Sequence, residues 1–427
     1  MDNGSKRHVF IETFGCQMNE NDTGRMLSFL KGNDYSPTDV PSEADLILVN
    51  TCSIRDKAEQ KVYSALGRFK RLKDKNPALL IGVTGCVAQQ KGSVLLEKAP
   101  YLDMVIGTHN IHNIPSVIKE VSGKKKRVSL TEFYEEIKAG EYSSAAKGGI
   151  KAYVNIMRGC DNFCTYCIVP YTRGGEVSRP AGDIIDEIKT LAGGGTKEVT
   201  LLGQNVNSYK GEVSFPELLR RAAGIGGVER VRFVTSHPKD ISKELIYLYG
   251  EEPKICRSIH LPLQSGSDMV LERMKRGYTA RGYLSKLELL KNLYPEISVT
   301  TDIIVGFPGE GGEDFKETMR CVREVEFDGI FSFKYSPRPM TAAAAFPDVV
   351  PPGIKQERLE ELQALQKEIT LEKNKALVGK TVKVLIEGQT KRNPVEVTGR
   401  TSCNRVVNLP SPRALAGCIA DVFVVDA

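Results

Sequence analysis

The sequence of 427 residues lacks any apolar run long enough to cross a membrane. A membrane-spanning helix needs about 18 consecutive apolar residues, and no stretch approaches this although 41% of the residues are hydrophobic. The start of the chain, residues 1–7, also lacks the apolar core of a secretion signal. We therefore expect a cytoplasmic protein with no membrane partner.

A large excess of charge is missing as well. The chain has 59 Lys and Arg against 53 Asp and Glu, a net charge of +6, which is compatible with a polyanionic partner without requiring one. Its length allows two or three domains, each able to bury its own core. Ten cysteines in a chain without a leader indicate a reducing compartment, where thiols stay free to bind metal.

Three cysteines, Cys160, Cys164 and Cys167, follow the strand-like run 152–157. Three thiolates at this spacing can hold three irons of a 4Fe-4S cube and leave the fourth without a protein ligand. An electron-transfer cluster is usually closed by four ligands, whereas an open iron can bind a substrate or cofactor. A zinc site or incidental thiols are the alternatives, and a lone Cys-x-x-Cys would equally fit a thioredoxin-like motif.

Strand and helix patterns alternate from residue 8 to about residue 121. This alternation predicts a parallel sheet with helices on both faces. The predicted strands are 8–14, 44–49 and 79–83, and the predicted helices are 21–30, 55–73 and one from about residue 89.

A cysteine follows each of these strands: Cys16, Cys52 and Cys86. Ligands bind at the carboxyl ends of the strands in an open α/β sheet, so these three positions can converge on one edge. They predict a second cluster that is again held by three thiolates. The alternative is three small buried hydrophobic residues, because cysteine is often buried.

The middle of the chain repeats the strand-helix unit about six times. The alternation lapses at 123–147, which we interpret as a linker between a domain at 7–122 and a domain at 148–377. Six parallel units predict an α/β fold with a partial barrel whose functional loops share one edge. The predicted strands are 152–157, 197–202, 230–234, 256–261, 297–305 and 329–335, and polar or glycine-rich loops follow at 203–207, 235–238, 263–266 and 306–310.

A helix at 353–377 precedes a small all-β domain at 378–427, with strands at 381–387, 395–400, 405–409 and 420–425. This last domain contains seven basic residues and four acidic residues. Small basic β-barrels commonly bind RNA. The basic residues are Lys380, Lys383, Lys391, Arg392, Arg400, Arg405 and Arg413. The predicted helix 55–75 is a second basic surface.

Nearly the whole chain resembles the radical S-adenosylmethionine methylthiotransferases, in their order of cluster domain, radical SAM barrel and TRAM domain. The motifs that carry this resemblance are 15–19, 50–52, 84–86, 158–167, 261–266 and 335–339. Met18 and Asn19 resemble the tRNA branch of the family. Gly203-Gln204-Asn205 stands where many radical SAM proteins have Gly-Gly-Glu.

The resemblance implies two 4Fe-4S clusters and S-adenosylmethionine. S-adenosylmethionine would chelate the open iron of the Cys160/Cys164/Cys167 cluster, and one electron would cleave its carbon-sulfur bond and release a 5′-deoxyadenosyl radical. The auxiliary cluster on Cys16, Cys52 and Cys86 would supply or carry sulfur. The implied product is a methylthio group on carbon 2 of isopentenyl-adenosine 37, in a base splayed from the tRNA anticodon loop. An electron donor such as a flavodoxin or ferredoxin and a monomeric state are also expected.

Few other residues are candidates for the site. Gln264 and Ser265 are predicted to make polar contacts with the cofactor, and Tyr166 either packs near its adenine or is a structural aromatic residue. His237 and His260 are expected to be structural, so no side-chain acid or base is predicted.

Three alternatives remain open from the sequence. Within the family, the substrate could be a threonylcarbamoyl-adenosine tRNA or ribosomal protein S12. The chain could instead be a non-catalytic iron-sulfur protein that binds RNA or transfers electrons. A zinc protein is the third alternative.

Overall fold

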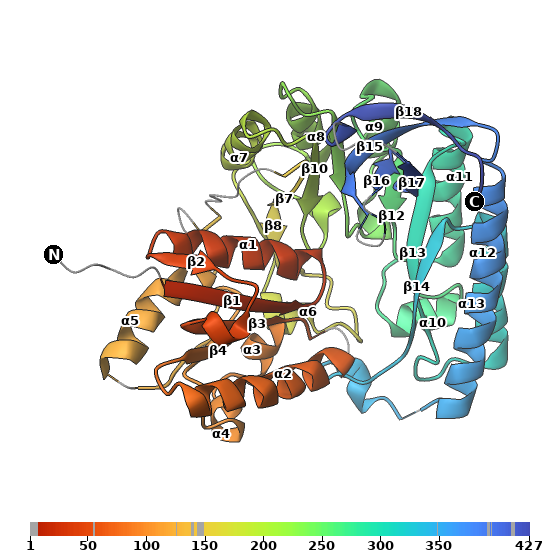
Figure 1. Cartoon of the computed structure of the whole chain (residues 1–427). Helices are drawn as coiled ribbons and strands as arrows, with labels where there is room; N and C mark the ends of the chain where they lie inside the picture. Colours follow the sequence, from red (N-terminus) through yellow and green to blue (C-terminus); the bar gives the residue numbers. More distant parts are fainter. Residues whose placement is uncertain are drawn as a thin grey trace. The chain divides into compact units, whose positions relative to one another are not determined.

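The computed structural model describes residues 7–53, 56–124, 126–137, 141–142, 149–347, 349–390, 393, 395–410 and 415–427. The chain divides into two compact units (Figure 1). The first consists of Met1–Lys147, Arg158–Asp161 and Ile168–Val177, and the second consists of Gly148–Met157, Asn162–Cys167 and Ser178–Ala427. Each unit is described separately.

A six-stranded parallel sheet forms the centre of the first unit. Its strands lie in the order β2 (Tyr35–Pro37), β1 (Arg7–Phe14), β3 (Leu46–Thr51), β4 (Leu80–Gly85), β5 (Met104–Ile106) and β6 (Val128–Leu130). The helices are α1 (Gln17–Lys31), α2 (Asp56–Lys75), α3 (Cys86–Lys91), α4 (Val94–Lys98), α5 (Ile114–Lys124) and α6 (Val169–Arg173), with short turns η1 (Pro41–Glu43) and η2 (Ile111–Asn113).

Helices cover both faces of this sheet, as the sequence predicts. All six residues of β3 are buried, because successive side chains point to opposite, covered faces. Leu46 and Leu48 share one core with residues of α1 and α5. Ile47 and Val49 share the other core with residues of α2, α3 and α4. Figure 1 shows α1 and α2 on opposite sides of the sheet.

The first sheet extends further than the sequence patterns predict. Strands β2, β5 and β6 have three residues each, too few to show a recognisable alternation. Strand β6 falls inside the stretch 123–147, which was predicted as a linker, and it pairs with β5. At 128–130 this stretch is therefore part of the sheet. Residues 125, 138–140 and 143–147 of the predicted linker lie outside the described residues.

Six parallel strands form the central part of the second unit. They are β7 (Lys151–Asn155), β10 (Glu198–Leu202), β11 (Arg230–Phe233), β12 (Ser258–His260), β13 (Ser298–Val305) and β14 (Gly329–Lys334). They form two ladders, β11-β10-β7 and β12-β13-β14. An isolated parallel bridge between Val231 and Ile255 continues β11 toward the segment that leads into β12. This arrangement confirms the predicted partial barrel.

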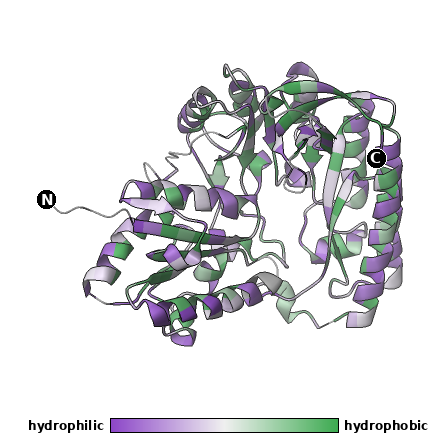
Figure 2. Ribbon diagram, in the orientation of Figure 1, coloured by the Kyte–Doolittle hydropathy of each residue, from purple (hydrophilic) through white to green (hydrophobic). Residues whose placement is uncertain are grey.

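Helices and short turns connect these strands. The helices are α7 (Ala181–Gly193), α8 (Phe215–Ala223), α9 (Lys243–Glu251), α10 (Asp268–Arg273), α11 (Ala280–Leu293), α12 (Gly312–Val325) and α13 (Pro352–Lys375). The turns are η3 (Val206–Ser208), η4 (Pro238–Asp240) and η5 (Ala342–Ala345), and short strands β8 (Met157–Arg158) and β9 (Val177–Ser178) pair with each other. One large hydrophobic core joins residues of the strands to residues of the helices. Figure 2 shows both hydrophobic and hydrophilic residues along α13, whose buried residues are Leu362, Gln366 and Ile369.

The C-terminal segment forms an antiparallel sheet in the order β17 (Val406–Pro410), β16 (Glu396–Thr401), β15 (Thr381–Gln389) and β18 (Ile419–Phe423). The buried residues Val384, Ile386, Val397 and Val422 form its own core, which confirms the predicted small all-β fold. Two buried arginines of β11 bind this sheet: Arg230 donates to the carbonyls of Arg400 and Lys383, and Arg232 donates to that of Ser402. Among the described residues, no helix combines the length and apolar character needed to cross a membrane.

Candidate functional site

Three cysteines of the first unit follow neighbouring strands at one edge of the sheet. Strand β3 lies between β1 and β4, and Phe14, Thr51 and Gly85, the last residues of the three strands, are in register. Cys16, Cys52 and Cys86 come one or two residues later. The structure therefore brings the three predicted residues to a common edge, as the strand ends predict.

The backbone around these cysteines is tightly constrained. Cys52 donates its N–H to the carbonyl of Phe14 (2.9 Å). Gly85 has a φ of +86°, and a Cβ at this position would lie 2.5 Å from the carbonyl oxygen of Thr51. Only glycine tolerates both the left-handed conformation and this close approach. The chain can therefore turn directly from β4 into α3, which begins at Cys86.

The thiols differ in exposure and in acidity. Cys16 is exposed, whereas Cys52 and Cys86 are buried. A hydrogen bond with the Cys52 thiol lowers the pKa of Cys16 to about 6; desolvation by the surrounding protein atoms opposes this effect and the charge of Arg173 supports it. Burial raises the pKa of the Cys86 thiol, and Arg173 again acts in the opposite direction. One thiol is thus predisposed to be a thiolate at neutral pH, the form that binds iron.

A buried arginine accompanies these thiols. Arg173, the last residue of α6, places Nη2 2.8 Å from Oδ2 of Asp22, and Arg25 donates to the other carboxylate oxygen (3.2 Å). Burial lowers the pKa of the Arg173 guanidinium, but Asp22, Cys86 and Cys16 outweigh burial and hold it well above its ordinary value. Sequence patterns gave no signal for Arg173 or Asp22, because charged residues are usually exposed.

The second cysteine group lies in the loop after β8. Gly159 has a φ of +76°, and a Cβ there would lie 1.8 Å from the carbonyl oxygen of Gly175, so only glycine fits. Cys160 is buried and donates its N–H to the carbonyl of Gly174 (3.2 Å). Cys164 is buried, and its carbonyl accepts the N–H of Cys167 (2.9 Å). Cys160 belongs to the first unit, and Cys164 and Cys167 belong to the second.

The part of this loop in the second unit is fixed by Thr165. Its N–H donates to the carbonyl of Met274 (3.1 Å), its hydroxyl donates to the carbonyl of Arg273 (2.8 Å), and its own carbonyl accepts the N–H of Ala343 (2.8 Å). The segment after α10 also supplies Arg276, whose Nη1 lies 3.3 Å from Sγ of Cys164. Like Arg173, Arg276 had no signal in the sequence.

No group of three His, Cys, Asp or Glu side chains in the described part of the chain is placed to hold a single metal ion. A four-iron cluster is larger than a single ion and takes its ligands from thiolates. Each cysteine group provides three thiols, two of which are buried, and an arginine accompanies each group. This donor set fits an iron-sulfur cluster with one iron left open.

Five of the buried polar atoms that have no hydrogen-bond partner among the described residues lie in loops at the carboxyl ends of the second unit's strands. They come from the loops after β10, β11, β12 and β14, and each belongs to a side chain that is at most 9% exposed. They are Asn205 Oδ1, Ser236 Oγ, His237 Nε2, Gln264 Oε1 and Tyr335 OH. Buried polar atoms are normally paired, so these loops fit a polar ligand such as S-adenosylmethionine.

The residues predicted to bind the cofactor differ from one another in their surroundings. Gln264 has a φ of +71° and an unpaired Oε1. The hydroxyl of Ser265 is completely buried, accepts the N–H of Ser267 (3.2 Å) and lies 3.3 Å from Oγ1 of Thr318. The ring of Tyr166 packs edge-on against Phe307, with 6.5 Å between the centroids. Gln264 thus has an atom available to a ligand, whereas Ser265 and Tyr166 already contact protein groups.

The two histidines also have protein partners. Burial, followed by the charge of Arg276, lowers the pKa of His237 to about 2, and its Nδ1 accepts the N–H of Lys239 (3.3 Å). His260 places Nδ1 3.0 Å from Oγ1 of Thr300. Burial therefore keeps the His237 imidazole neutral, and its Nε2 has no partner among the described residues.

Several basic side chains of the predicted basic surfaces form ion pairs with acidic residues. In the C-terminal sheet, Arg405 binds Asp328 (2.5 Å), and Arg400 lies 3.5 Å from Glu387. Lys383 pairs with Asp421 at an exposed position. Lys391, Arg392 and Arg413 lie outside the described residues, as does Arg55 of the predicted helix 55–75.

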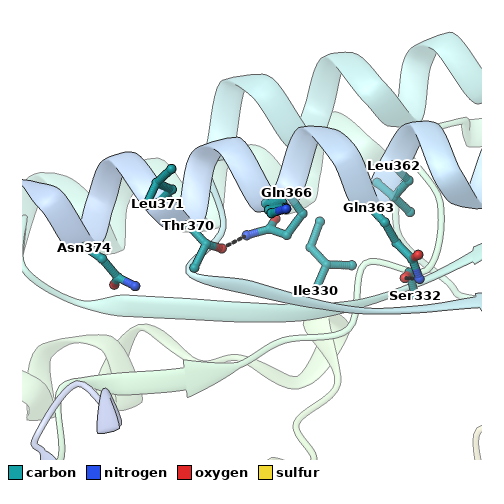
Figure 3. Close-up of a pocket in the computed structure, with 9 residues that line it drawn as sticks. Ile330, Ser332, Leu362, Gln363, Gln366, Thr370, Leu371 and Asn374 are labelled. Carbon is teal, nitrogen blue, oxygen red and sulfur yellow. Dashed lines mark hydrogen bonds between the residues drawn. The ribbon is translucent and has the colours of Figure 1, made fainter. Parts of the chain in front are cut away.

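The outer layer of the second unit has a groove of about 450 Å³ between α13 and β14 (Figure 3). Gln366 donates to Thr370 at its centre (2.9 Å). The groove is lined by Ile330, Ser332, Leu362, Gln363, Gln366, Lys367, Thr370, Leu371 and Asn374. It contains none of the predicted site residues.

Comparisons with known proteins show to which class of proteins the chain belongs. Family models match three segments: uncharacterized protein family UPF0004 at residues 8–107, the radical SAM superfamily at 154–322 and the TRAM domain at 375–427. The structure of the radical S-adenosylmethionine methyltransferase TsrM from Kitasatospora setae shares the fold, with a TM-score of 0.58 at 13% identity over 80% of this chain and 75% of that chain. OxsB, a cobalamin-dependent radical enzyme, has a TM-score of 0.52 at 15% identity over 84% of this chain and 56% of its own. The chain is thus a radical SAM protein with a C-terminal TRAM domain.

Full-length relatives narrow the class to a family. The tRNA-2-methylthio-N(6)-dimethylallyladenosine synthase of Geobacter sulfurreducens is 50% identical over 98% of this chain and 95% of its own length. Those of Syntrophus aciditrophicus and Geobacter metallireducens are 50% and 51% identical, over 99% and 97% of this chain and 93% and 95% of their own lengths. The chain belongs to the family of tRNA-2-methylthio-N(6)-dimethylallyladenosine synthases.

Proposed function

We propose that this protein adds a methylthio group to carbon 2 of isopentenyl-adenosine 37 in tRNA. The observation that carries the proposal is the presence of two separate three-cysteine groups in a chain that is about 50% identical to synthases of this name over nearly its whole length. One group would serve radical formation and the other would serve sulfur transfer. We expect the domains at 7–122, 148–377 and 378–427 to divide this work.

Two 4Fe-4S clusters are the proposed resident cofactors. Cys16, Cys52 and Cys86 would hold the auxiliary cluster, and Cys160, Cys164 and Cys167 would hold the radical SAM cluster. When bound to the second cluster, S-adenosylmethionine supplies, on one-electron reduction, a radical able to abstract hydrogen from an unactivated carbon. Side-chain acids and bases are too weak for this step.

Residues of the second unit would bind and orient S-adenosylmethionine. The loops at the strand ends contain three buried side-chain oxygens without a partner among the described residues, those of Gln264, Asn205 and Ser236. These oxygens can accept hydrogen bonds from the cofactor. Tyr166 lies within the cysteine loop and would limit the space beside the cofactor through its contact with Phe307. Ser265 would act indirectly, because its hydroxyl fixes the backbone after Gln264.

The proposed substrate is the anticodon stem-loop of tRNA, whose unpaired nucleotides can be splayed out at low cost. The C-terminal sheet would contribute to tRNA binding, since TRAM is the domain that its sequence matches. A flavodoxin or ferredoxin as electron donor, a monomeric state and a cytoplasmic location complete the proposal. A membrane partner is not proposed.

A direct test uses the anaerobically reconstituted protein with S-adenosylmethionine, a reductant and tRNA that carries isopentenyl-adenosine but no methylthio group. Nucleoside mass spectrometry should detect the methylthio product. Cys52→Ala should abolish this product while 5′-deoxyadenosine still forms, and Cys164→Ala should abolish both. Cys256→Ala, which removes a buried thiol from neither group, should retain both products. A methylthio product only on threonylcarbamoyl-adenosine tRNA or on ribosomal protein S12 would overturn the proposed substrate.

A further inference from the structure

Arg276 is a buried cation without a carboxylate partner among the described residues. The residue is 5% exposed, and none of the ion pairs found in the described part of the chain includes it. An arginine stays protonated in proteins. A buried charge without a counter-charge costs several kcal/mol, so a negative group must balance this guanidinium.

The contacts of Arg276 identify that group. Nη1 donates to Sγ of Cys164 (3.3 Å), Nη2 donates to the carbonyl of Pro262 (2.9 Å), and Nε donates to the hydroxyl of Tyr278 (2.9 Å). A carbonyl and a phenol are neutral acceptors. Burial raises the pKa of Tyr278, which keeps this phenol protonated. Among these three contacts, only the Cys164 sulfur can carry a negative charge.

The same three contacts join the cysteine loop to the loop after β12. Arg276 contacts both Cys164 and Pro262, and the hydroxyl of Tyr278 also donates to the carbonyls of Pro262 (3.1 Å) and Leu263 (2.8 Å). The next residue, Gln264, has the left-handed backbone and the unpaired Oε1. The position of Gln264 relative to Cys164 therefore depends on Arg276.

We propose that Arg276 is a positioning residue for the radical SAM cluster, balancing its negative charge, raising its reduction potential and holding the Gln264 loop against the cysteine loop. The inference rests on the proposed function, which assigns Cys164 to that cluster. Hydrogen bonds to sulfur and nearby charge are among the factors that set the potential of iron-sulfur clusters. A fixed positive charge stabilises the reduced form, which is more negative by one charge, and therefore makes the cluster easier to reduce.

The test compares the reconstituted wild type with Arg276→Gln, Arg276→Lys and Arg220→Gln. Arg220→Gln is the matched control, because it removes the same charge from a partly exposed position on α8 that pairs with Glu244 and Glu251. The readouts are the iron content per chain and the reduction potential, followed by electron paramagnetic resonance, of the cluster whose signal changes when S-adenosylmethionine is added. The measurements are made in the Cys52→Ala background, which lacks one ligand of the auxiliary cluster, so that the signal is that of the radical SAM cluster.

Arg276→Gln should shift this potential to a more negative value or lose the cluster, Arg276→Lys should retain the cluster with a smaller shift, and Arg220→Gln should match the wild type. Full iron content and an unchanged potential in Arg276→Gln would overturn the proposal. An unchanged potential combined with weaker S-adenosylmethionine binding would also overturn it, because the counter-charge would then be the cofactor's carboxylate. The proposed function fails separately, if the wild type holds both clusters and leaves the tRNA unmodified.

Discussion

Nη2 of Arg173 lies 2.8 Å from Oδ2 of Asp22, and the Asp22 side chain is completely buried. The two residues are separated by 151 positions in the sequence. Asp22 also binds Arg25 through its other oxygen, and Arg25 lies 3.7 Å from the buried carboxylate of Glu141 as well, so two buried guanidinium groups share the Asp22 carboxylate. The edge that carries Cys16 and Cys86 is therefore built on a charge cluster as well as on strand ends.

Asp22→Asn should strongly destabilise the first unit. It removes the carboxylate that pairs with Arg173 and leaves Arg25 only its longer contact with Glu141, and breaking a buried pair in this way costs about 3–5 kcal/mol. The free energy of unfolding of the metal-free protein, measured by urea denaturation with circular dichroism, should fall by an amount in this range. Asp421→Asn, which breaks the exposed pair with Lys383, should change it by less than about 1 kcal/mol. Equal losses in the two variants would contradict this account of the charge cluster.

The acidity of Cys16 predicts a pH-dependent reaction in the metal-free protein. A pKa of about 6 means that the thiolate persists as the pH falls from 8 to about 6 and is lost below that value. Alkylation of Cys16 by iodoacetamide, followed by peptide mass spectrometry, should therefore reach half of its maximal rate near pH 6. Cys52→Ala removes the largest cause of the shift and should move the midpoint to higher pH. A midpoint that stays in place would show that Cys52 does not lower this pKa.

The sequence predicts the positions of the cysteines well because strand ends carry topological information. In a parallel sheet, residues after neighbouring strands meet at one edge, and Phe14, Thr51 and Gly85 are indeed in register. The loops at 203–207 and 263–266 were predictable for the same reason. They follow β10 and β12, and two of their residues, Asn205 and Gln264, have unpaired buried atoms.

The buried charges at the two cysteine groups could not be predicted. The residues around Arg173 and Arg276 do not indicate that these arginines are buried, because their environment is created by tertiary contacts with Asp22 and Cys164. Strand β6 escaped prediction for a different reason. Its three residues form a strand by pairing with the free edge of β5. The local sequence does not show that this edge is available.

Gly159→Ala should disrupt the cysteine loop. A Cβ would lie 1.8 Å from the carbonyl of Gly175, and the left-handed φ of +76° adds strain for any other residue. The reconstituted variant should lose about four irons per chain, the content of one cluster. Gly67→Ala in α2 is the control, because nothing lies within 4 Å of the added methyl group. That variant should keep all its iron and gain about 0.5–1 kcal/mol of stability from higher helix propensity.

Arg232→Met should loosen the contact between the C-terminal sheet and the barrel. Arg232 donates to the carbonyls of Ser402 and Thr401 and binds Glu198, whose side chain is 3% exposed. The substitution leaves Glu198 buried, with Arg230 3.9 Å away as its remaining cation, so we expect a loss of about 3–5 kcal/mol. Hydrogen exchange at 396–410 should become faster than in the wild type, while exchange in the first unit stays unchanged. Arg400→Met, which removes a partly exposed partner of Glu387, is the control, and equally fast exchange in that variant would contradict a specific role for Arg232.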